Sequence, residues 1–334
     1  MKVSLTGIKP SGTVHIGNYL GAIVPAIELA RRFERSLYFI ADEHALTSVE
    51  DPAKLHAQIY DLAATWLACG LDPERTFFYR QSAIPEVFEL AWILGCVAPK
   101  GLLDRAHAYK AALAAGEAIN VGVYTYPVLM AADILLFDTT VVPVGKDQKQ
   151  HVEIARDVAE KFNRLYGDVL ALPEPEIGDQ SMTVPGLDGR KMSKSYDNVI
   201  PLWAPAAQRR KLVMRIKTNS QAPAEPKDTE SSEIFQLYRL FATPQQTAQL
   251  ERRYAAGIGW ADAKTALADV MEERLAPLRA RYEALRADEA ALDRVLEQGA
   301  QRARAIARAT LARVRAAVGI ATPGASAAQR ETAT

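Results

Sequence analysis

Short runs of β-branched and aromatic residues recur along the first half of the chain, separated by longer segments with helical spacing. The runs are Val3 to Ile8, Leu37 to Ala41, Thr76 to Tyr79 and Thr140 to Val144. One intervening segment begins at Asp51-Pro52, repeats apolar residues every three or four positions from Leu55 to Leu67, and closes at Gly70. This alternation predicts an α/β fold, a Rossmann-like parallel sheet covered by helices.

The pattern changes after about Lys217. Residues 218–232 are polar and include Pro223 and Pro226, which predicts a linker. The sequence beyond it has helical spacing and no strand pattern, with a kink expected at Pro277. We therefore predict a sheet-containing domain at 1–217, a C-terminal α-helical domain at 218–320, and a disordered tail at 321–334.

Composition narrows the class of protein. The 334 residues are 49% hydrophobic and 24% charged with a formal net charge of +0, which excludes a disordered or supercharged chain. Any contact with nucleic acid must then come from local basic clusters. Two such clusters are present, and either could contact phosphate, although a charged helix face is ordinarily just solvated. One consists of Arg209, Arg210, Lys211, Arg215 and Lys217, and the other of Arg302, Arg304, Arg308, Arg313 and Arg315.

Two further features concern location and metals. The N-terminal residues lead directly into a strand with no long apolar segment, so neither a secretory signal nor a membrane span is visible and a cytoplasmic location is expected. Cys69 and Cys96 are too few for a cysteine-based metal cluster, and both lie in apolar runs, which predicts buried thiols.

A first motif follows the first strand, where residues 7–21 read GIKPSGTVHIGNYLG. His15 and Asn18 are three residues apart, so on a helix their side chains share a face and can donate together to phosphate oxygens. Gly17 leaves no β-carbon where a nucleotide would press on the backbone. Taken alone, the motif is weak, because a turn with a capping histidine is the commoner interpretation of such a string.

A second motif lies downstream, where Asp188-Gly189-Arg190 forms a turn before Lys191-Met192-Ser193-Lys194-Ser195. The two lysines can contact one polyphosphate, and the two serines add hydroxyl donors. Lysine acts here as a point charge that neutralises a leaving pyrophosphate. Together with the first motif, this loop predicts a site that consumes ATP; a solvated basic turn is the alternative for the loop alone.

With both motifs in this order, the chain resembles the class I aminoacyl-tRNA synthetases. The strings from Thr125 to Leu135 and from Val142 to His151 are similar to the tryptophanyl-tRNA synthetase family of bacterial type, and the similarity covers residues 1–320. It implies ATP with Mg²⁺, L-tryptophan and tRNA(Trp) as partners, and a homodimer. Residues 1–217 would activate the amino acid and residues 218–320 would bind the anticodon.

The resemblance implies an ATP site from both motifs and nearby segments, with Lys191, Lys194, His15 and Asn18 as its catalytic residues. Its members would be Lys9, Ser11, Gly12, His15, Gly17, Asn18, Lys110, Gly145, Asp147, Lys191, Met192, Ser193, Lys194 and Ser195. Surface roles fit Lys110 and Lys146 equally well. Two departures stand out: Lys9 replaces the glutamine usual in the family, and Ala112 lies where relatives often carry a lysine. Mg²⁺ would be held mainly by phosphates and water, because the sequence shows no carboxylate cage.

The expected tryptophan site is built around Asp133, a carboxylate within an apolar run. Such a group needs a buried donor, and an indole has one N–H and no acceptor. A structural role for Asp133, capping a helix or pairing with a backbone amide, is the alternative. The resemblance adds substrate-binding residues, any of which could instead be core or loop residues: Tyr126, Gln148, Met130, Val144, Gly7 and His44.

The implied reaction has two steps, adenylate formation with release of pyrophosphate and transfer of tryptophan to the 3′ end of tRNA. The nearest rival is a tyrosyl-tRNA synthetase, for which a glutamine ahead of the carboxylate is expected; Ala131 and Ala132 stand there instead. Another rival is a noncatalytic paralogue that binds tryptophan or RNA, although such a protein would not need the pyrophosphate loop. A nucleotidyltransferase would share the first motif without requiring the arginine-rich helices.

Overall fold

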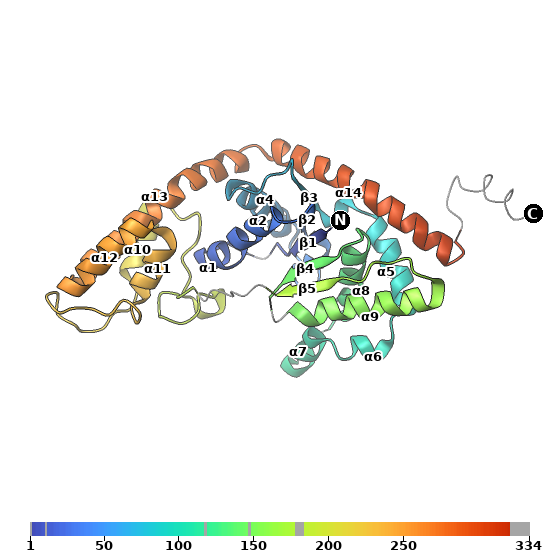
Figure 1. Ribbon diagram of the computed structural model, residues 1–334, viewed down its shortest axis with the longest axis horizontal. Helices are drawn as coiled ribbons and strands as arrows, with labels where there is room; N and C mark the ends of the chain where they lie inside the picture. The colour runs from blue at the N-terminus through green and yellow to red at the C-terminus, as the bar shows by residue number, and fades with distance from the viewer. Residues whose placement is uncertain (1, 11, 117–118, 146–147, 178–183, 321–334) are drawn as a thin grey trace, which may run out of the picture.

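A five-stranded parallel sheet forms the centre of the molecule. The computed structural model describes residues 2–10, 12–116, 119–145, 148–177 and 184–320 (Figure 1). The strands lie in the order β3-β2-β1-β4-β5, and all neighbouring pairs are parallel. Their bounds are β1 Val3–Ile8, β2 Arg35–Ile40, β3 Thr76–Arg80, β4 Val141–Val144 and β5 Glu174–Ile177. The predicted Rossmann-like α/β class is thereby confirmed.

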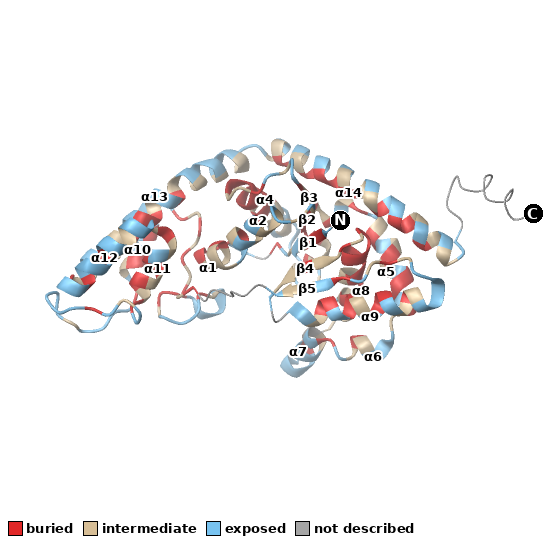
Figure 2. Cartoon of the chain, in the orientation of Figure 1, coloured by how far each residue is buried: buried red, intermediate tan, exposed pale blue. Residues whose placement is uncertain are grey.

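The sheet separates two hydrophobic cores because successive side chains of a strand point to opposite faces. In β2, Leu37 and Phe39 belong to one core, whereas Tyr38 and Ile40 belong to the other. All four are buried, as expected of a parallel sheet covered on both faces. Figure 2 shows buried residues on the helices that surround the sheet.

Helices cover both faces of this sheet. On one face lie α5 (Glu86–Val97), α8 (Val121–Leu135) and α9 (Lys149–Tyr166), whose apolar sides fill the core that contains Leu37. On the other lie α2 (Val24–Ala30) and α4 (Pro52–Ala68), whose apolar sides fill the core that contains Tyr38. Shorter elements connect them: α1 Ile16–Asn18, η1 Tyr19–Ile23, α3 Asp42–Ala45, η2 Gln81–Ala83, α6 Lys100–Leu103, α7 His107–Ala115 and η4 Lys194–Tyr196.

Among the described residues, the named elements that follow η4 are all helices, in agreement with the predicted helical C-terminal region. The helices are α10 Ala206–Met214, α11 Glu233–Phe241, α12 Pro244–Ala256, α13 Trp260–Arg286 and α14 Glu289–Ala317. Pro277 lies inside α13, which continues beyond it. The boundary at 217/218 stays a prediction, since α10 and α13 pack together and α14 returns to the sheet.

Helix α14 lies directly on β3 and α5 (Figure 1). Gly299 permits this close approach, because a Cβ at that position would lie only 1.9 Å from the carbonyl oxygen of Phe78. The last described helix is therefore part of the packing that supports the strands carrying the site.

Three details differ from, or add to, the sequence-based picture. Strand β5 was not predicted. Cys69 is half-buried, and burial raises the pKa of its thiol to about 12, but Cys96 is exposed, so the prediction of two buried thiols is wrong for Cys96. The apolar run that contains Cys96 has an outward face on α5, which also exposes Trp92. Within the described residues, no helix is long and apolar enough to span a membrane.

Candidate active site

The predicted site segments gather at the carboxyl ends of the parallel strands. The first motif follows β1, His44 lies four residues after β2, and Gly145 follows β4. Gln81, which sequence analysis did not single out, comes directly after β3. Because β1 and β4 are neighbours although they are not consecutive, the order of strands reverses between them, which is where open α/β sheets bind ligands.

The first motif forms a reciprocal cap at the start of α1. Asn18 N donates to Nδ1 of His15 at 3.3 Å, and His15 N donates to Oδ1 of Asn18 at 3.1 Å. The capping histidine that the sequence left open is therefore present. It does not exclude phosphate binding, because the cap uses only one ring nitrogen of His15 and only the amide oxygen of Asn18.

The cap also fixes the charge and tautomer of His15. Since Nδ1 accepts a hydrogen bond, the ring proton lies on Nε2 and that nitrogen is a donor. Burial of the ring, and secondly the positive charge of Lys194, lower the pKa of His15 to about 4. At neutral pH His15 is an uncharged donor held at a helix start.

The second motif packs against the first. Gly17 N lies 3.2 Å from the Met192 sulfur, and Met192 is buried. A Cβ on Gly12, which has φ +61°, would lie 3.1 Å from Lys194 Nζ. The two strings are thus brought together in space although about 175 residues separate them in the chain.

The loop that carries the two lysines is braced from within by Asn198, a buried residue that sequence analysis missed. Its side-chain amide donates to Oδ1 of Asp188 at 2.7 Å and to the Lys191 carbonyl at 3.1 Å, and accepts from Ser193 N at 2.8 Å. The hydrogen bond from Asn198, together with those from Arg190, lowers the pKa of Asp188 to about 2. These contacts shape the loop while the side chains of Lys191, Lys194 and Ser195 stay exposed.

A large cavity of about 1080 Å³ lies where the motifs meet. It is lined by predicted site residues from three segments, namely Gly7, Lys9, Gly12, Asn18, Val144, Gly145 and Lys194. Lys9 Nζ also donates to Thr47 Oγ1 at 3.2 Å. Lys110 is exposed on α7, and neither it nor Lys191 is among the lining residues. Ser11, Lys146 and Asp147 lie outside the described residues.

Asp133 is buried on α8, with only 2% of its surface exposed. Gln81 Nε2 donates to its two carboxylate oxygens at 3.0 and 2.8 Å, and His44 Nδ1 lies 3.7 Å from Oδ2. Burial raises the pKa of Asp133 well above its ordinary value, although the hydrogen bond from Gln81 opposes the shift. The donor seen here is a side-chain amide, and not the backbone amide that the structural alternative supposed.

A second hydrogen-bonded chain lies beside the first. Tyr126 Oη and His151 Nε2 are 2.6 Å apart, and His151 Nδ1 lies 2.8 Å from Oε1 of Gln148. The rings of His44 and Tyr126 meet edge-on at 6.2 Å, which joins the two chains. His151 was also missed by sequence analysis, and Met130 is half-buried on the same helix as Tyr126.

Ion pairs within the protein engage most of the basic cluster on α14, but only Arg209 and Arg210 of the first cluster. Arg304 and Arg308 of α14 bind Glu86, and Arg315 binds Glu89. The pairs of Arg313 with Asp138 and of buried Arg209 with Glu272 follow the same pattern. The exposed members of the first cluster that have no ion pair among the described residues are Lys211, Arg215 and Lys217.

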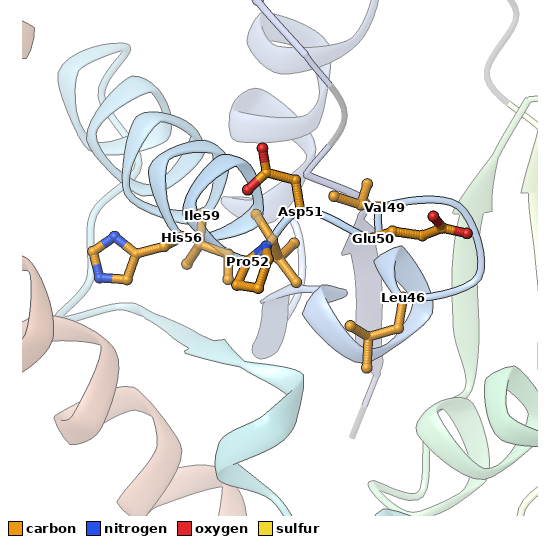
Figure 3. Close-up of a pocket in the computed structure, with 8 residues that line it drawn as sticks. Leu46, Val49, Glu50, Asp51, Pro52, His56 and Ile59 are labelled. Atoms are coloured by element: carbon orange, nitrogen blue, oxygen red, sulfur yellow. The ribbon is translucent and has the colours of Figure 1, made fainter.

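A smaller apolar pocket of about 280 Å³ lies beside the start of α4 (Figure 3). Its lining residues run from Leu46 to Ile59 and include none of the predicted site residues. This pocket therefore lies apart from the predicted site residues that line the large cavity and from the buried cluster around Asp133.

These observations define the class of protein. The family model described as tRNA synthetases class I (W and Y) matches residues 2–276, which contain both motifs. The chain, in which the two motifs meet at the carboxyl edge of a parallel sheet, is therefore a class I tRNA synthetase.

Individual relatives narrow the assignment. A tryptophan–tRNA ligase of Xanthomonas campestris is 54% identical over 327 residues, covering 95% of this chain and 76% of the relative. One from Pseudomonas aeruginosa is 51% identical over 328 residues, covering 95% and 73%. The crystal structure of a Campylobacter jejuni tryptophanyl-tRNA synthetase with ADP and tryptophan has a TM-score of 0.91 and 41% identity, covering 95% of this chain and 100% of that chain. The chain belongs to the tryptophan–tRNA ligase family.

Proposed function

We propose that this protein activates L-tryptophan with ATP and transfers it to tRNA(Trp). The observation that carries the proposal is the contact between the two motifs at one large cavity, where Lys194 lies against Gly12 and Met192 lies against Gly17. Positive charge and backbone amides are thereby gathered where a polyphosphate would bind.

In the first step, the tryptophan carboxylate attacks the α-phosphorus of ATP, the bond to the bridging oxygen breaks, and pyrophosphate leaves. Lys191 and Lys194 neutralise the charge that grows on the leaving group, while His15 and Asn18 donate to phosphate oxygens. The protein contributes positioning and charge, so no protein nucleophile is needed.

Mg²⁺ would accompany ATP and neutralise part of its phosphate charge. Within the described part of the chain, no group of three or more His, Cys, Asp or Glu side chains is placed to hold a metal ion. We therefore propose that ATP phosphates and water supply most of its ligands.

Tryptophan would bind with its indole N–H directed at Asp133 and its ammonium group near Tyr126 and Gln148. Asp133 supports this choice because it is buried and ionisable, and because the indole offers a donor without an acceptor. Phenylalanine would leave this carboxylate without the indole donor, and its smaller ring would also lose contacts.

The second step transfers tryptophan from the adenylate to a terminal ribose hydroxyl of the tRNA. We propose that Lys211, Arg215 and Lys217 contact tRNA phosphates, because they are exposed while the arginines of α14 are engaged in ion pairs. Such an enzyme would work in the cytoplasm, where tRNA is charged.

We also propose a homodimer that uses the outward face of α5. Phe88 and Trp92 are 40% and 75% exposed, and four-residue spacing places them and Cys96 on one side of the helix. A Trp92→Glu variant should elute as a monomer in size-exclusion chromatography with light scattering. A wild-type monomer, or a variant that remains dimeric, would contradict this interface.

Exchange of labelled pyrophosphate into ATP, measured with each of the twenty amino acids, tests the activity directly. Exchange with tryptophan alone is the expected result. Exchange with tyrosine would identify a tyrosyl-tRNA synthetase, and no exchange with any amino acid would identify a noncatalytic paralogue.

A further inference from the structure

Gln81 occupies a position that neither the motifs nor the proposed substrate contacts assign. It is 0% exposed and begins η2 directly after β3. Its amide nitrogen lies 3.0 and 2.8 Å from the two oxygens of Asp133 and 2.8 Å from His44 Nδ1. Its amide oxygen accepts from His44 N at 3.2 Å and lies 3.1 Å from His44 Nδ1.

These contacts fix which way the amide faces. The backbone N–H of His44 can only donate, so it requires the amide oxygen of Gln81 on its side. The nitrogen then faces Asp133, whose two carboxylate oxygens accept from it. One amide hydrogen is thereby directed at the carboxylate, and both amide atoms of Gln81 lie within hydrogen-bond distance of His44 Nδ1.

A carboxylate held in this way has a defined direction for its remaining lone pairs. Asp133 lies among apolar neighbours of α8, and Gln81 is the side chain of the described structure that donates to it. A hydrogen bond to an ionised acceptor is stronger than one to a neutral acceptor, and a buried carboxylate without a donor would take up a proton and accept more weakly from an indole. Position and charge of Asp133 therefore both depend on one amide.

We propose that Gln81 is a specificity-determining positioning residue, which holds the Asp133 carboxylate so that it selects substrates with a ring N–H. This inference rests on the proposed tryptophan activation. It differs from a purely structural role, in which the amide would only join η2 to α8. Loss of a structural amide would lower kcat/KM equally for substrates with and without a ring N–H.

The test compares tryptophan with its isostere 3-(benzothiophen-3-yl)alanine, in which sulfur replaces the ring N–H. Wild-type protein, Gln81→Met and Gln81→Leu are assayed by pyrophosphate exchange with each substrate at saturating ATP. We expect the ratio of kcat/KM for tryptophan to that for the isostere to fall about tenfold or more in both variants. The KM for ATP should be unchanged.

Two controls separate positioning from structure. Gln236→Met removes an amide that donates to backbone carbonyls at the start of α11, and should leave the ratio at its wild-type value. In an Asp133→Asn background, Gln81→Met should have no further effect on the ratio, because the group through which it acts is already altered.

An unchanged ratio in folded Gln81 variants, or an equal fall in kcat/KM for both substrates, would overturn the proposal. Failure of both variants to fold, judged by thermal unfolding, would also overturn it by assigning Gln81 to structure alone. Absence of tryptophan-dependent exchange in the wild type would instead refute the proposed function, so the two failures are distinguishable.

Discussion

Replacement of Asp133 by asparagine separates the chemistry of the proposed pocket from its shape. The two side chains are nearly identical in size, but asparagine has one acceptor oxygen and one NH₂ group in place of two acceptors. Gln81 already donates to this position, so the asparagine oxygen turns towards Gln81. Its NH₂ group then faces the expected indole N–H, and two donors oppose each other.

The magnitude follows from the hydrogen bond that is lost. A bond to a charged acceptor contributes about 1.5–3 kcal/mol when its partner is buried. This corresponds to roughly a 10- to 150-fold fall in kcat/KM for tryptophan. The KM for ATP should stay at its wild-type value, because Asp133 is not among the residues that line the large cavity.

Stability should move in the opposite direction. Burial, as the largest cause, raises the pKa of Asp133 well above its ordinary value of 3.8, so the folded state binds this proton more tightly than the unfolded chain. Its contribution to stability therefore declines as pH rises through and above the usual range of a carboxyl group. Asparagine removes that decline, and the variant should unfold at the same or a higher temperature at pH 7.

Pyrophosphate exchange with varied tryptophan, and thermal unfolding of the same samples, measure both effects. A variant with normal kcat/KM would refute the assignment of the indole N–H to Asp133. A variant that lost activity and stability together would show that the carboxylate is a structural brace, and the reasoning about its burial would be wrong.

Three further changes address other parts of the structure. Lys194→Ala should slow pyrophosphate exchange about 10²–10³-fold, since the lysine acts mainly on the transition state. The affinity for tryptophan, measured by calorimetry, should stay within about twofold of wild type. Equal falls in exchange rate and in tryptophan affinity would contradict that role. Gly299→Ala should lower the free energy of unfolding by about 1–3 kcal/mol in urea titrations, because its methyl group would press on the Phe78 carbonyl. Glu86→Gln should lower the unfolding temperature at pH 7. Burial acts to raise the pKa of Glu86, but hydrogen bonds from Arg304 and Arg308 outweigh it and lower the pKa. The ionised carboxylate therefore stabilises the fold above the usual carboxyl range, and this stabilisation is lost as pH falls through the lowered pKa. The difference between that variant and wild type should vanish in acid.

Local pattern was sufficient to predict most of the sheet. Strands β1 to β4 were predicted within one or two residues at each end, because each is a short run rich in β-branched or aromatic residues. Strand β5 reads Glu174-Pro175-Glu176-Ile177, and neither its charges nor its proline signal a strand. It forms at the sheet edge through pairing with β4, where a proline is tolerated. That pairing depends on tertiary contact and is absent from the local pattern.

The candidate site shows a similar division. Asp133 was found because a carboxylate within an apolar run is conspicuous, but Gln81 and His151 are single polar residues whose meaning comes from partners 52 and 25 residues away. The arginines of α14 show the same dependence on distant partners. Their spacing on one helix resembles a phosphate-binding face, yet Glu86, more than two hundred residues earlier, neutralises two of them. Sequence alone does not indicate which charges meet.

The two motifs would contribute differently to phosphate binding, because one is fixed at a helix cap and the other lies on an exposed loop. His15 is fixed by its cap at a helix start, and burial keeps it uncharged at neutral pH, so it can orient phosphate oxygens without adding a permanent charge. Lys191 and Lys194 lie on an exposed loop whose base is braced by Asn198. Charge placed there can follow the leaving pyrophosphate as the bond to the α-phosphorus breaks, whereas a charge at the rigid cap would favour bound ATP and the transition state equally. In the proposed reaction, this arrangement would therefore stabilise the transition state more than the bound substrate.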